Sequence, residues 1–312
     1  MKTIPILFTF DSKFEMPAGV AITSLLENAA PETFYDIFIL HGPQCDFSHS
    51  PLMALPGKYG NCRITCRKVE GEFVGSYEVR GIPETAYYRM LAPELIPEYG
   101  KILYSDVDVI FREDLGRYYE KDLGDNCFGG VDNCSSLRPS MRKYIGKELG
   151  LDWKKGYFYS GNLIINSELI LREGLTAKFR ELGKNNYLQQ DMDIINIACN
   201  GRFMEMGPSF CLTTFLYSLC MEKTGEMERL YGKEEVAHAL SSGIVHYNGP
   251  KPWNTPCLNA DIWWDYYRRS FFFDEKFCHD FWKAQSERLL RLSFTKRIKL
   301  LLRYPLDKKN LK

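Results

Sequence analysis

Short apolar runs that fit buried strands alternate with helical patterns along the first 200 residues of the chain. The expected strands are Ile4–Thr9, Phe34–Leu40, Ile64–Val69, Lys101–Ser105, Phe128–Val131 and Leu163–Ile165. Helices are expected at Ala18–Leu26 after Pro17, at Glu84–Leu91 after Pro83, and at Asp191–Cys199. Strands and helices that alternate with short connections are typical of the α/β class with a largely parallel sheet.

The composition supports a folded chain with a sizeable core. The 312 residues are 45% hydrophobic and 14% aromatic, which argues against disorder, and their formal net charge is zero. A neutral total argues against a surface built to bind nucleic acid. Because no linker divides the sequence, we expect one α/β domain at 1–258 and a helical C-terminal extension at 259–312. Glycines and prolines predict that 207–260 is rich in loops.

Cysteines and apolar segments bear on the cellular compartment. The ten cysteines contain no CxxC pair, so most are expected to be reduced and buried, as in a cytosolic protein. The N-terminal apolar run Ile4–Phe10 is too short for a signal peptide and fits a first strand. The uncharged stretch Met206–Met221 contains several polar residues and does not fit a bilayer span.

The last part of the chain is basic. From Gln285 to Lys312 there are nine Lys/Arg and two Asp/Glu, a net charge of +7, so the rest of the chain carries −7. A helix expected between Gln285 and Tyr304 would place an apolar stripe (Leu290, Phe294, Ile298, Leu301) opposite a basic face (Arg288, Lys296, Lys299, Arg303). This pattern favours binding to an anionic membrane surface. The alternative is a helix packed on its own body or on a second copy of the chain.

Two carboxylates follow the expected strand Lys101–Ser105. In the segment Tyr104-Ser-Asp-Val-Asp-Val-Ile110, extended backbone would direct Asp106 and Asp108 to one side and Val107 to the core. Carboxylates held together repel each other, and a divalent cation is the usual relief. Open α/β sheets bind ligands where such strands end. The alternative is a solvated acidic turn that caps a following helix.

A histidine near the end of the α/β region fits the same cation. In His246-Tyr-Asn-Gly-Pro-Lys-Pro-Trp253, His246 follows a short apolar run and offers a nitrogen ligand. Oxygen ligands with one imidazole suit Mn²⁺ better than Mg²⁺. Gly249 and the neighbouring prolines shape a tight loop, and Lys251 is placed to meet a phosphate. The other four histidines have no comparable setting.

Six segments together resemble glycosyltransferase family 8, the retaining GT-A enzymes that include bacterial lipopolysaccharide galactosyl- and glucosyltransferases and glycogenin. The resemblance covers roughly residues 4 to 255. Its segments are Ile6-Leu-Phe-Thr-Phe-Asp11, Ala86-Tyr-Tyr-Arg89, Lys101-Ile-Leu-Tyr-Ser-Asp-Val-Asp108, Phe158-Tyr-Ser-Gly-Asn-Leu-Ile-Ile-Asn166, Gln190-Asp-Met-Asp-Ile-Ile-Asn196 and His246-Tyr-Asn-Gly-Pro-Lys-Pro-Trp253. The resemblance implies a GT-A fold, a Rossmann-like nucleotide-diphospho-sugar transferase with a mostly parallel central sheet.

The resemblance also assigns roles to individual residues. It implies that Asp106, Asp108 and His246 bind the metal. Asp132 and Asp191 match residues that hydrogen-bond donor-sugar hydroxyls, and Lys251 matches the lysine that stabilises the leaving diphosphate. Contacts to the nucleotide sugar are implied for Asp11, Arg89, Asp106, Val107, Asp108, Ser160, Gly249 and Lys251. From local sequence alone, Asp11 and Asp191 fit helix starts, Asp132 fits a turn, and Arg89 fits a helix surface.

Two positions depart from the family pattern. Tyr159 stands where an asparagine is usual, and Met192 stands where a glutamine often follows the first aspartate. That glutamine has been considered as a nucleophile, a role that a thioether cannot fill. Asp191 is an alternative nucleophile, but we favour front-face displacement assisted by the leaving phosphate. Both departures lie near the expected sugar pocket, so they leave the donor sugar open.

Together these observations predict a metal-dependent retaining hexosyltransferase of bacterial type. We expect it to transfer glucose or galactose from UDP-glucose or UDP-galactose, with Mn²⁺ or Mg²⁺, to a glycan or lipid-linked acceptor of lipopolysaccharide or exopolysaccharide biosynthesis. It would lie in the cytoplasm, peripherally on the inner face of the cytoplasmic membrane. The alternatives are a nucleotide-sugar or glycan-binding protein without turnover, and a nucleotidyltransferase, for which the usual phosphate loop near the N-terminus is missing.

Overall fold

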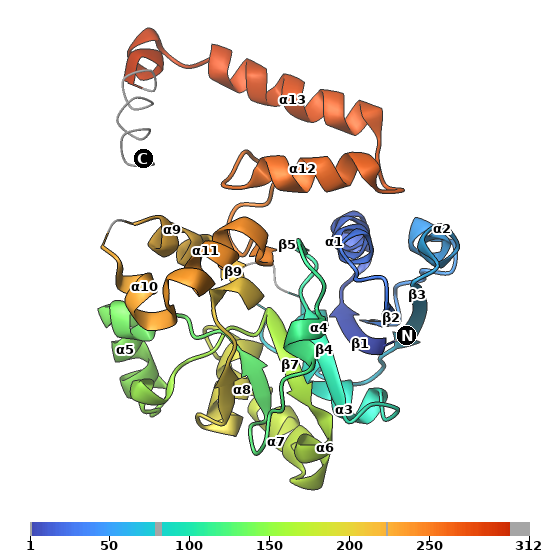
Figure 1. Ribbon diagram of the computed structural model, residues 1–312, viewed down its shortest axis with the longest axis vertical. Coiled ribbons are helices and arrows are strands. Elements are labelled where there is room, and N and C mark those ends of the chain that lie inside the picture. The colour runs from blue at the N-terminus through green and yellow to red at the C-terminus, as the bar shows by residue number, and fades with distance from the viewer. Residues whose placement is uncertain (1, 79–82, 223, 300–312) are drawn as a thin grey trace.

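The computed structural model describes residues 2–78, 83–222 and 224–299 of the chain. Its centre is a seven-stranded sheet in the order β3-β2-β1-β4-β7-β6-β8 (Figure 1). These strands are β1 (Lys2–Thr9), β2 (Thr33–His41), β3 (Cys62–Lys68), β4 (Lys101–Ser105), β6 (Phe128–Gly130), β7 (Asn162–Asn166) and β8 (Phe203–Glu205). All neighbouring strands are parallel except at β7, which is antiparallel to both β4 and β6. The predicted α/β class with a mostly parallel sheet is confirmed.

A smaller sheet lies beside the main one. It consists of β5 (Val109–Ile110), β10 (Val245–His246) and β9 (Leu212–Thr213), in the order β5-β10-β9. Only three residues separate β5 from β4 of the main sheet, so the segment between these two strands links the sheets. Strand β10 is antiparallel to β5 and parallel to β9.

Side chains alternate along the central strands and build a core on each face of the sheet. On one face, Ile4, Ile6 and Phe8 of β1 pack with apolar residues of α1 (Glu15–Glu27). On the other face, Leu7 packs with Tyr104 and with the 3₁₀ segment Glu84–Leu91. That face also carries the helices α3 (Ala92–Leu95), α6 (Ser167–Arg172), α7 (Leu175–Leu182) and α8 (Asp191–Cys199).

Helix α1 is buried between the sheet and a C-terminal helix. Every residue from Pro17 to Leu26 is buried, which fits a helix covered on all sides. Figure 1 shows α12 (Ala260–Arg269) lying over α1, and α13 (Glu275–Leu290) lying beyond α12. A Cβ on Gly19 would come within 2.0 Å of the ring of Phe272, so glycine is required for this approach.

The remaining helices complete the periphery: α2 (Leu55–Tyr59), α4 (Gly116–Tyr119), α5 (Pro139–Lys143), α9 (Thr214–Met221), α10 (Glu226–Tyr231) and α11 (Lys233–Ser242). The last three lie in 207–260, the region expected to be rich in loops, and the sequence did not predict them. The glycines and prolines in this region lie between the helices rather than within them. Helix α9, for example, follows Pro208 and begins where the Thr213 side chain accepts a hydrogen bond from the Leu216 amide.

The single C-terminal helix expected between Gln285 and Tyr304 is wrong. Helix α13 ends at Leu290, and a separate helical segment covers residues 294–299. Ser293 begins this segment, because its Oγ accepts a hydrogen bond from the Lys296 amide at 3.4 Å. Leu290 and Phe294 therefore lie on different helices, and Leu301 and Arg303 lie outside the described residues.

Candidate active site

Strand order brings distant segments to one edge of the sheet. Strands β1 and β4 are parallel neighbours, so the residues that follow Thr9 and Ser105 emerge side by side. Strand β10 then pairs with β5, with His246 opposite Val109. This pairing places His246 beside the segment that leaves β4. Ligands of open α/β sheets bind at such an edge.

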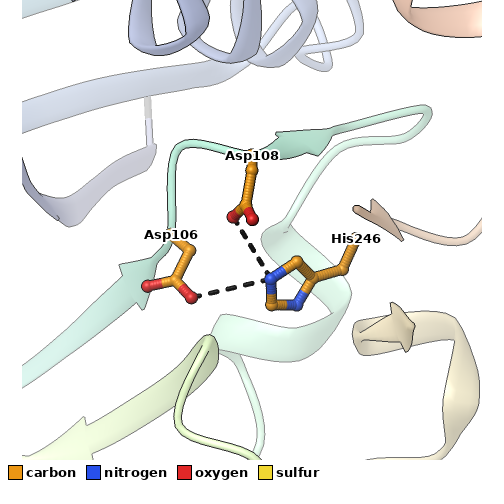
Figure 2. A group of neighbouring side chains, drawn as sticks. All are labelled: Asp106, Asp108 and His246. Carbon is orange, nitrogen blue, oxygen red and sulfur yellow. Dashed lines mark ion pairs between the residues drawn. The ribbon is translucent and has the colours of Figure 1, made fainter. Parts of the chain in front are cut away.

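Asp106, Asp108 and His246 form a compact cluster (Figure 2). One ligand atom from each residue lies within 4.8 Å of the others. The His246 Nε2 atom is 3.2 Å from Asp108 Oδ1 and 3.6 Å from Asp106 Oδ2. Val107 between the aspartates is buried, as expected, although the strand stops before Asp106 and residues 107 and 108 form a bend.

The cluster has the donor set and the space that a divalent cation requires. Two carboxylates and one imidazole suit Mn²⁺, which accepts both oxygen and nitrogen ligands. Gly161 keeps the space open, because a Cβ there would lie 2.3 Å from His246 Cε1 and 2.8 Å from Asp106 Oδ2. The Gly161 carbonyl also accepts a hydrogen bond from the Asp106 amide at 2.7 Å. The residues therefore fit the metal that the family resemblance implies.

Charged neighbours control the ionisation of the cluster. Burial alone would raise the pKa of Asp108, but Lys251 and His246 hold that pKa well below its usual range. Burial alone would lower the pKa of His246, but the Asp108 carboxylate and Cys211 raise it well above its usual range. The Cys211 Sγ lies 3.3 Å from His246 Nδ1, whereas the other ring nitrogen, Nε2, faces the aspartates.

Lys251 reaches the same cluster from the loop after β10. Its ammonium group donates hydrogen bonds to Asp108 Oδ2 and to the Tyr247 carbonyl. Lys251 and Gly249 both line the cavity beside the cluster. An ammonium group in this position can exchange its contact with Asp108 for a contact with a bound phosphate.

Arg89 links the cluster to Asp191 at the start of α8. Its guanidinium group lies 3.0 Å from Asp106 and 3.3 Å from Asp191, and it donates to the Ser160 carbonyl at 2.6 Å. The side chain is buried and lies over the ring of Tyr104. Burial raises the pKa of Asp191, whereas Arg89 opposes this shift. Arg89 is therefore a buried tie between two carboxylates, not a charge on a helix surface.

These residues line a cavity of about 580 Å³. Of the residues singled out in the sequence, the cavity is lined by Arg89, Asp106, Val107, Asp108, Ser160, Asp191, His246, Gly249 and Lys251. Both positions that depart from the family pattern, Tyr159 and Met192, also lie in its wall. The structure thus brings together residues from opposite ends of the α/β region.

Two singled-out residues do not line the cavity. Asp132 Oδ1 accepts a hydrogen bond from the Tyr157 amide at 2.9 Å, and its neighbour Asn133 occupies the wall instead. Asp11 accepts a hydrogen bond from the Lys13 amide and caps the 3₁₀ turn that follows β1. The local alternatives, a turn and a helix cap, describe the contacts of these two side chains. Their roles toward a donor remain predictions.

Sequence reasoning missed a group of cavity residues outside the motifs: Phe14, Asn133, Arg138, Met141 and Phe215. Arg138 lies immediately before α5, and its guanidinium carbon is 4.4 Å from the centre of the Phe215 ring in α9. These two residues are far apart in sequence and belong to no short motif. Nothing in the sequence therefore indicated the contact.

Comparisons with known proteins agree with this geometry. The model of the family "Glycosyl transferase family 8" matches residues 5–257. A lipopolysaccharide 1,2-glucosyltransferase of Escherichia coli is 22% identical over 279 residues, which are 86% of this chain and 78% of that protein. The glycosyltransferase GlyE of Streptococcus pneumoniae is 23% identical over 223 residues, and the match spans 66% of this chain but only 47% of GlyE.

Solved structures show the same fold. The galactosyltransferase LgtC in complex with donor and acceptor sugar analogues superposes with a TM-score of 0.73 and 26% identity, over 88% of this chain and 99% of LgtC. The apo form of GlyE superposes with a TM-score of 0.62 and 18% identity, over 92% of this chain and 64% of GlyE. The fold is therefore GT-A, as the sequence resemblance implied. Because the family model covers most of the sequence, the chain belongs to glycosyl transferase family 8 and is an enzyme, a glycosyltransferase.

Proposed function

We propose that the protein is a metal-dependent, retaining hexosyltransferase that takes glucose or galactose from a UDP-sugar. The observation that carries this proposal is the Asp106–Asp108–His246 cluster, with Lys251 beside it, in one cavity. The similarity to a glucosyltransferase and to a galactosyltransferase supports a hexose donor. The name of the E. coli relative supports an acceptor of the lipopolysaccharide or exopolysaccharide type.

The chemistry follows from the charges of the site. Transfer breaks the bond between the anomeric carbon and the diphosphate, and a new bond forms to an acceptor hydroxyl on the same face of the sugar. Asp106, Asp108 and His246 would hold Mn²⁺ or Mg²⁺, which supplies Lewis-acid stabilisation of charge on the diphosphate. Lys251 would donate to a phosphate oxygen as negative charge grows there.

Asp191 would be the carboxylate that faces the positive charge that develops on the sugar ring. Arg89 and Ser160 hold its position, and such charge is stabilised by carboxylates in other glycosyl transfers. A thioether at Met192 cannot act as a nucleophile, which supports front-face displacement. In that reaction the departing phosphate oxygen takes the proton of the acceptor hydroxyl.

The C-terminal helices support a second part of the proposal, that residues 259–312 form an extension that binds an anionic membrane surface. Leu289, Leu290, Phe294 and Ile298 are exposed apolar side chains. They lie among Arg288, Arg291, Lys296, Arg297 and Lys299. Within residues 2–78, 83–222 and 224–299, no helix combines the length and the apolar character that a bilayer crossing requires. Peripheral attachment at the inner face of the membrane would bring the cavity to a lipid-linked acceptor.

UDP release from a panel of UDP-sugars, with Mn²⁺ and then with EDTA, tests the proposal. We expect slow hydrolysis of one hexose donor that stops with EDTA and returns when Mn²⁺ is added. UDP binding without turnover of any donor, even with bacterial glycan extracts, would instead indicate a binding protein. The absence of UDP binding would contradict the proposed donor class. Family membership already favours glycosyl transfer over the nucleotidyltransferase alternative.

A further inference from the structure

Most charged side chains of the cavity are already paired with each other. Asp106 and Asp191 face Arg89, and Asp108 faces Lys251 and His246. Arg138 also lines the cavity, but it has no ion pair within 4.0 Å in the part of the chain that the structure describes. Among the described residues, this guanidinium group is therefore the cavity cation that forms no ion pair with a carboxylate.

Aromatic contacts hold this unpaired cation in place. The Arg138 side chain is half-buried and lies over the ring of Phe215, 4.4 Å from its centre. The guanidinium group is also close enough to Tyr159 to oppose the rise that burial causes in the pKa of that phenol. Phe215 and Tyr159 both belong to the cavity wall. Stacking leaves the edge of the guanidinium group, with its N–H donors, available to a ligand.

Arg138 belongs to a basic segment in a chain whose body is acidic. From Arg138 to Lys155 there are six Lys/Arg and two Asp/Glu, a net charge of +4, whereas residues 1–284 together carry −7. Arg142, one helical turn after Arg138, lies 5.3 Å from the centre of the Trp153 ring and does not line the cavity. A local positive surface beside a cavity attracts anionic ligands.

Two groups of elements form the cavity walls. Phe10 and Phe14 follow β1, whereas Arg138, Met141 and Phe215 come from α5, the residue before it, and α9. Figure 1 shows β1 and the pair α5 and α9 toward opposite sides of the fold. Under the proposed function, the nucleotide occupies the end after β1, beside Asp11. The end with Arg138 then remains for the acceptor.

We propose that Arg138, held against Phe215, is an acceptor subsite that binds an anionic group, a phosphate or a carboxylate, carried by the acceptor saccharide. The subsite rests on the proposed function, because it needs a donor at the opposite end of the cavity. Arginine binds both anions through two parallel hydrogen bonds. The Phe215 ring fixes the guanidinium plane and offers an apolar face to a sugar ring.

The test uses the full chain with saturating UDP and Mg²⁺, so that the diphosphate position is filled and no paramagnetic ion broadens the ligand signals. Ligand-observed NMR measures Kd for two matched pairs, glucose 6-phosphate with glucose and galacturonate with galactose. We expect the anionic member of at least one pair to bind about tenfold or more tightly than its neutral partner. A preference confined to the first pair indicates a phosphate, and one confined to the second indicates a carboxylate.

Variants separate the subsite from general charge. Arg138→Gln should remove the preference for the anion while changing the Kd of the neutral sugar less than about twofold. Arg138→Lys should keep part of the preference, because the charge remains but the planar donor pair is lost. Arg142→Gln is the matched control and should change neither value. Phe215→Leu should weaken both members of a pair.

Several outcomes would overturn the subsite. One is equal binding of charged and neutral sugars by the unaltered protein. Another is an Arg138→Gln variant that keeps the preference for the anion. A third is an Arg142→Gln variant that loses this preference as fully as Arg138→Gln does. UDP binding and melting temperature, measured for each variant, show whether it is folded. If the unaltered protein binds no UDP, the proposed function fails. If UDP binds normally and the contrast is absent, only the subsite fails.

Discussion

The sheet edge at Asp106 and the helices after residue 259 both concentrate charged and aromatic side chains, but they use them differently. At the edge, His246 and Arg89 are each 5% exposed and contact carboxylates. In the last helical segment, Phe294 is 76% exposed, and the basic side chains around it face solvent. In the first arrangement, oppositely charged side chains form ion pairs in a cavity. The second displays solvent-exposed basic side chains and apolar area together, which suits a partner surface.

The two regions obtain their specificity in different ways. Charges at the edge are buried, where the effective dielectric constant is low. The removal of one charge therefore leaves its partner buried without a counter-charge, which costs much free energy. Charges on the C-terminal helices remain hydrated, so each adds a small, nearly independent amount. Single substitutions should therefore have large effects at the edge, and the terminal charges should act by their sum.

Asp108→Asn should have the largest effect. The amide keeps the shape of the side chain but removes the charge that faces both Lys251 and His246. We expect UDP release to fall by about 1,000-fold or more, because stabilisation of a developing charge at such a site is commonly worth that much. The far-UV circular dichroism spectrum should not change.

Asp125→Asn is the matched control, because Asp125 is an exposed aspartate of the same body. Its turnover should equal that of the unaltered protein. Near-normal turnover of Asp108→Asn would show that the cluster does not bind the metal. The edge and the C-terminal helices would then not differ in the way described above.

Sequence alone predicted the edge better than the rest of the site. β4 and α8 begin and end at the expected residues, because an apolar run before Asp106 and a periodic face after Gln190 leave little choice of boundary. The Asp106–Asp108 pair and His246 could be assigned to one metal site from the sequence, because the family motifs that contain them lie at strand ends. The contact between Arg138 and Phe215 could not be predicted, because tertiary packing alone brings α5 and α9 together.

The secondary-structure elements that were predicted wrongly or missed also have physical explanations. Helices α9, α10 and α11 are short, and their stability comes from packing rather than from a strong local pattern, so the glycines and prolines around them dominated the prediction. Apolar periodicity continued across Leu290 and Phe294, but the Ser293 side chain begins a new helix at that point. The antiparallel direction of β7 left no signal in an apolar run.

Trp264→Ala should cause the next largest effect, and it tests whether the C-terminal helices belong to the folded body. Trp264 is fully buried in α12, packs against Phe277 and Phe281 of α13, and donates a hydrogen bond to the Pro252 carbonyl at 3.2 Å. We expect the free energy of unfolding to fall by about 3–5 kcal/mol, the usual cost of a truncated core tryptophan. Urea denaturation measures this loss.

Trp282→Ala is the matched control within the same aromatic cluster. This side chain is 42% exposed, so its truncation should cost less than about 1 kcal/mol. Equal losses for the two variants would contradict the distinction between a buried α12 face and an exposed α13 face.

Charge reversal at the end of the described chain tests whether the exposed basic residues act by their sum. Lys296→Glu, Arg297→Glu and Lys299→Glu together should weaken co-sedimentation with phosphatidylserine vesicles by about 100-fold or more. Each basic residue near an anionic surface contributes up to about 1 kcal/mol. UDP release from a soluble donor should not change.

The control for charge reversal is the triple variant Lys121→Glu, Lys184→Glu and Lys233→Glu, which changes the same net charge at exposed positions of the body. It should bind the vesicles nearly as well as the unaltered protein. If the two triple variants lose binding equally, net charge rather than the C-terminal surface governs attachment. If neither loses binding, the membrane proposal fails.

Cys211→Ala should produce the smallest effect, and it tests how finely the edge is built. Cys211 Sγ is the contact at His246 Nδ1, so it fixes the ring with Nε2 toward the aspartates. The loss of such an outer partner typically weakens metal affinity 10–100-fold, and a weak sulfur contact places the expectation near tenfold. Mn²⁺ titration followed by electron paramagnetic resonance, with UDP bound, measures the change.

Cys211→Ser should restore most of the affinity, because a hydroxyl can hold the same ring nitrogen. Cys134→Ala removes another buried thiol and should leave the affinity unchanged. If Cys211→Ala binds Mn²⁺ as tightly as the unaltered protein, the contact with Cys211 does not orient His246 for metal binding. The residues that line the cavity would then determine the metal affinity without support from the thiol behind them.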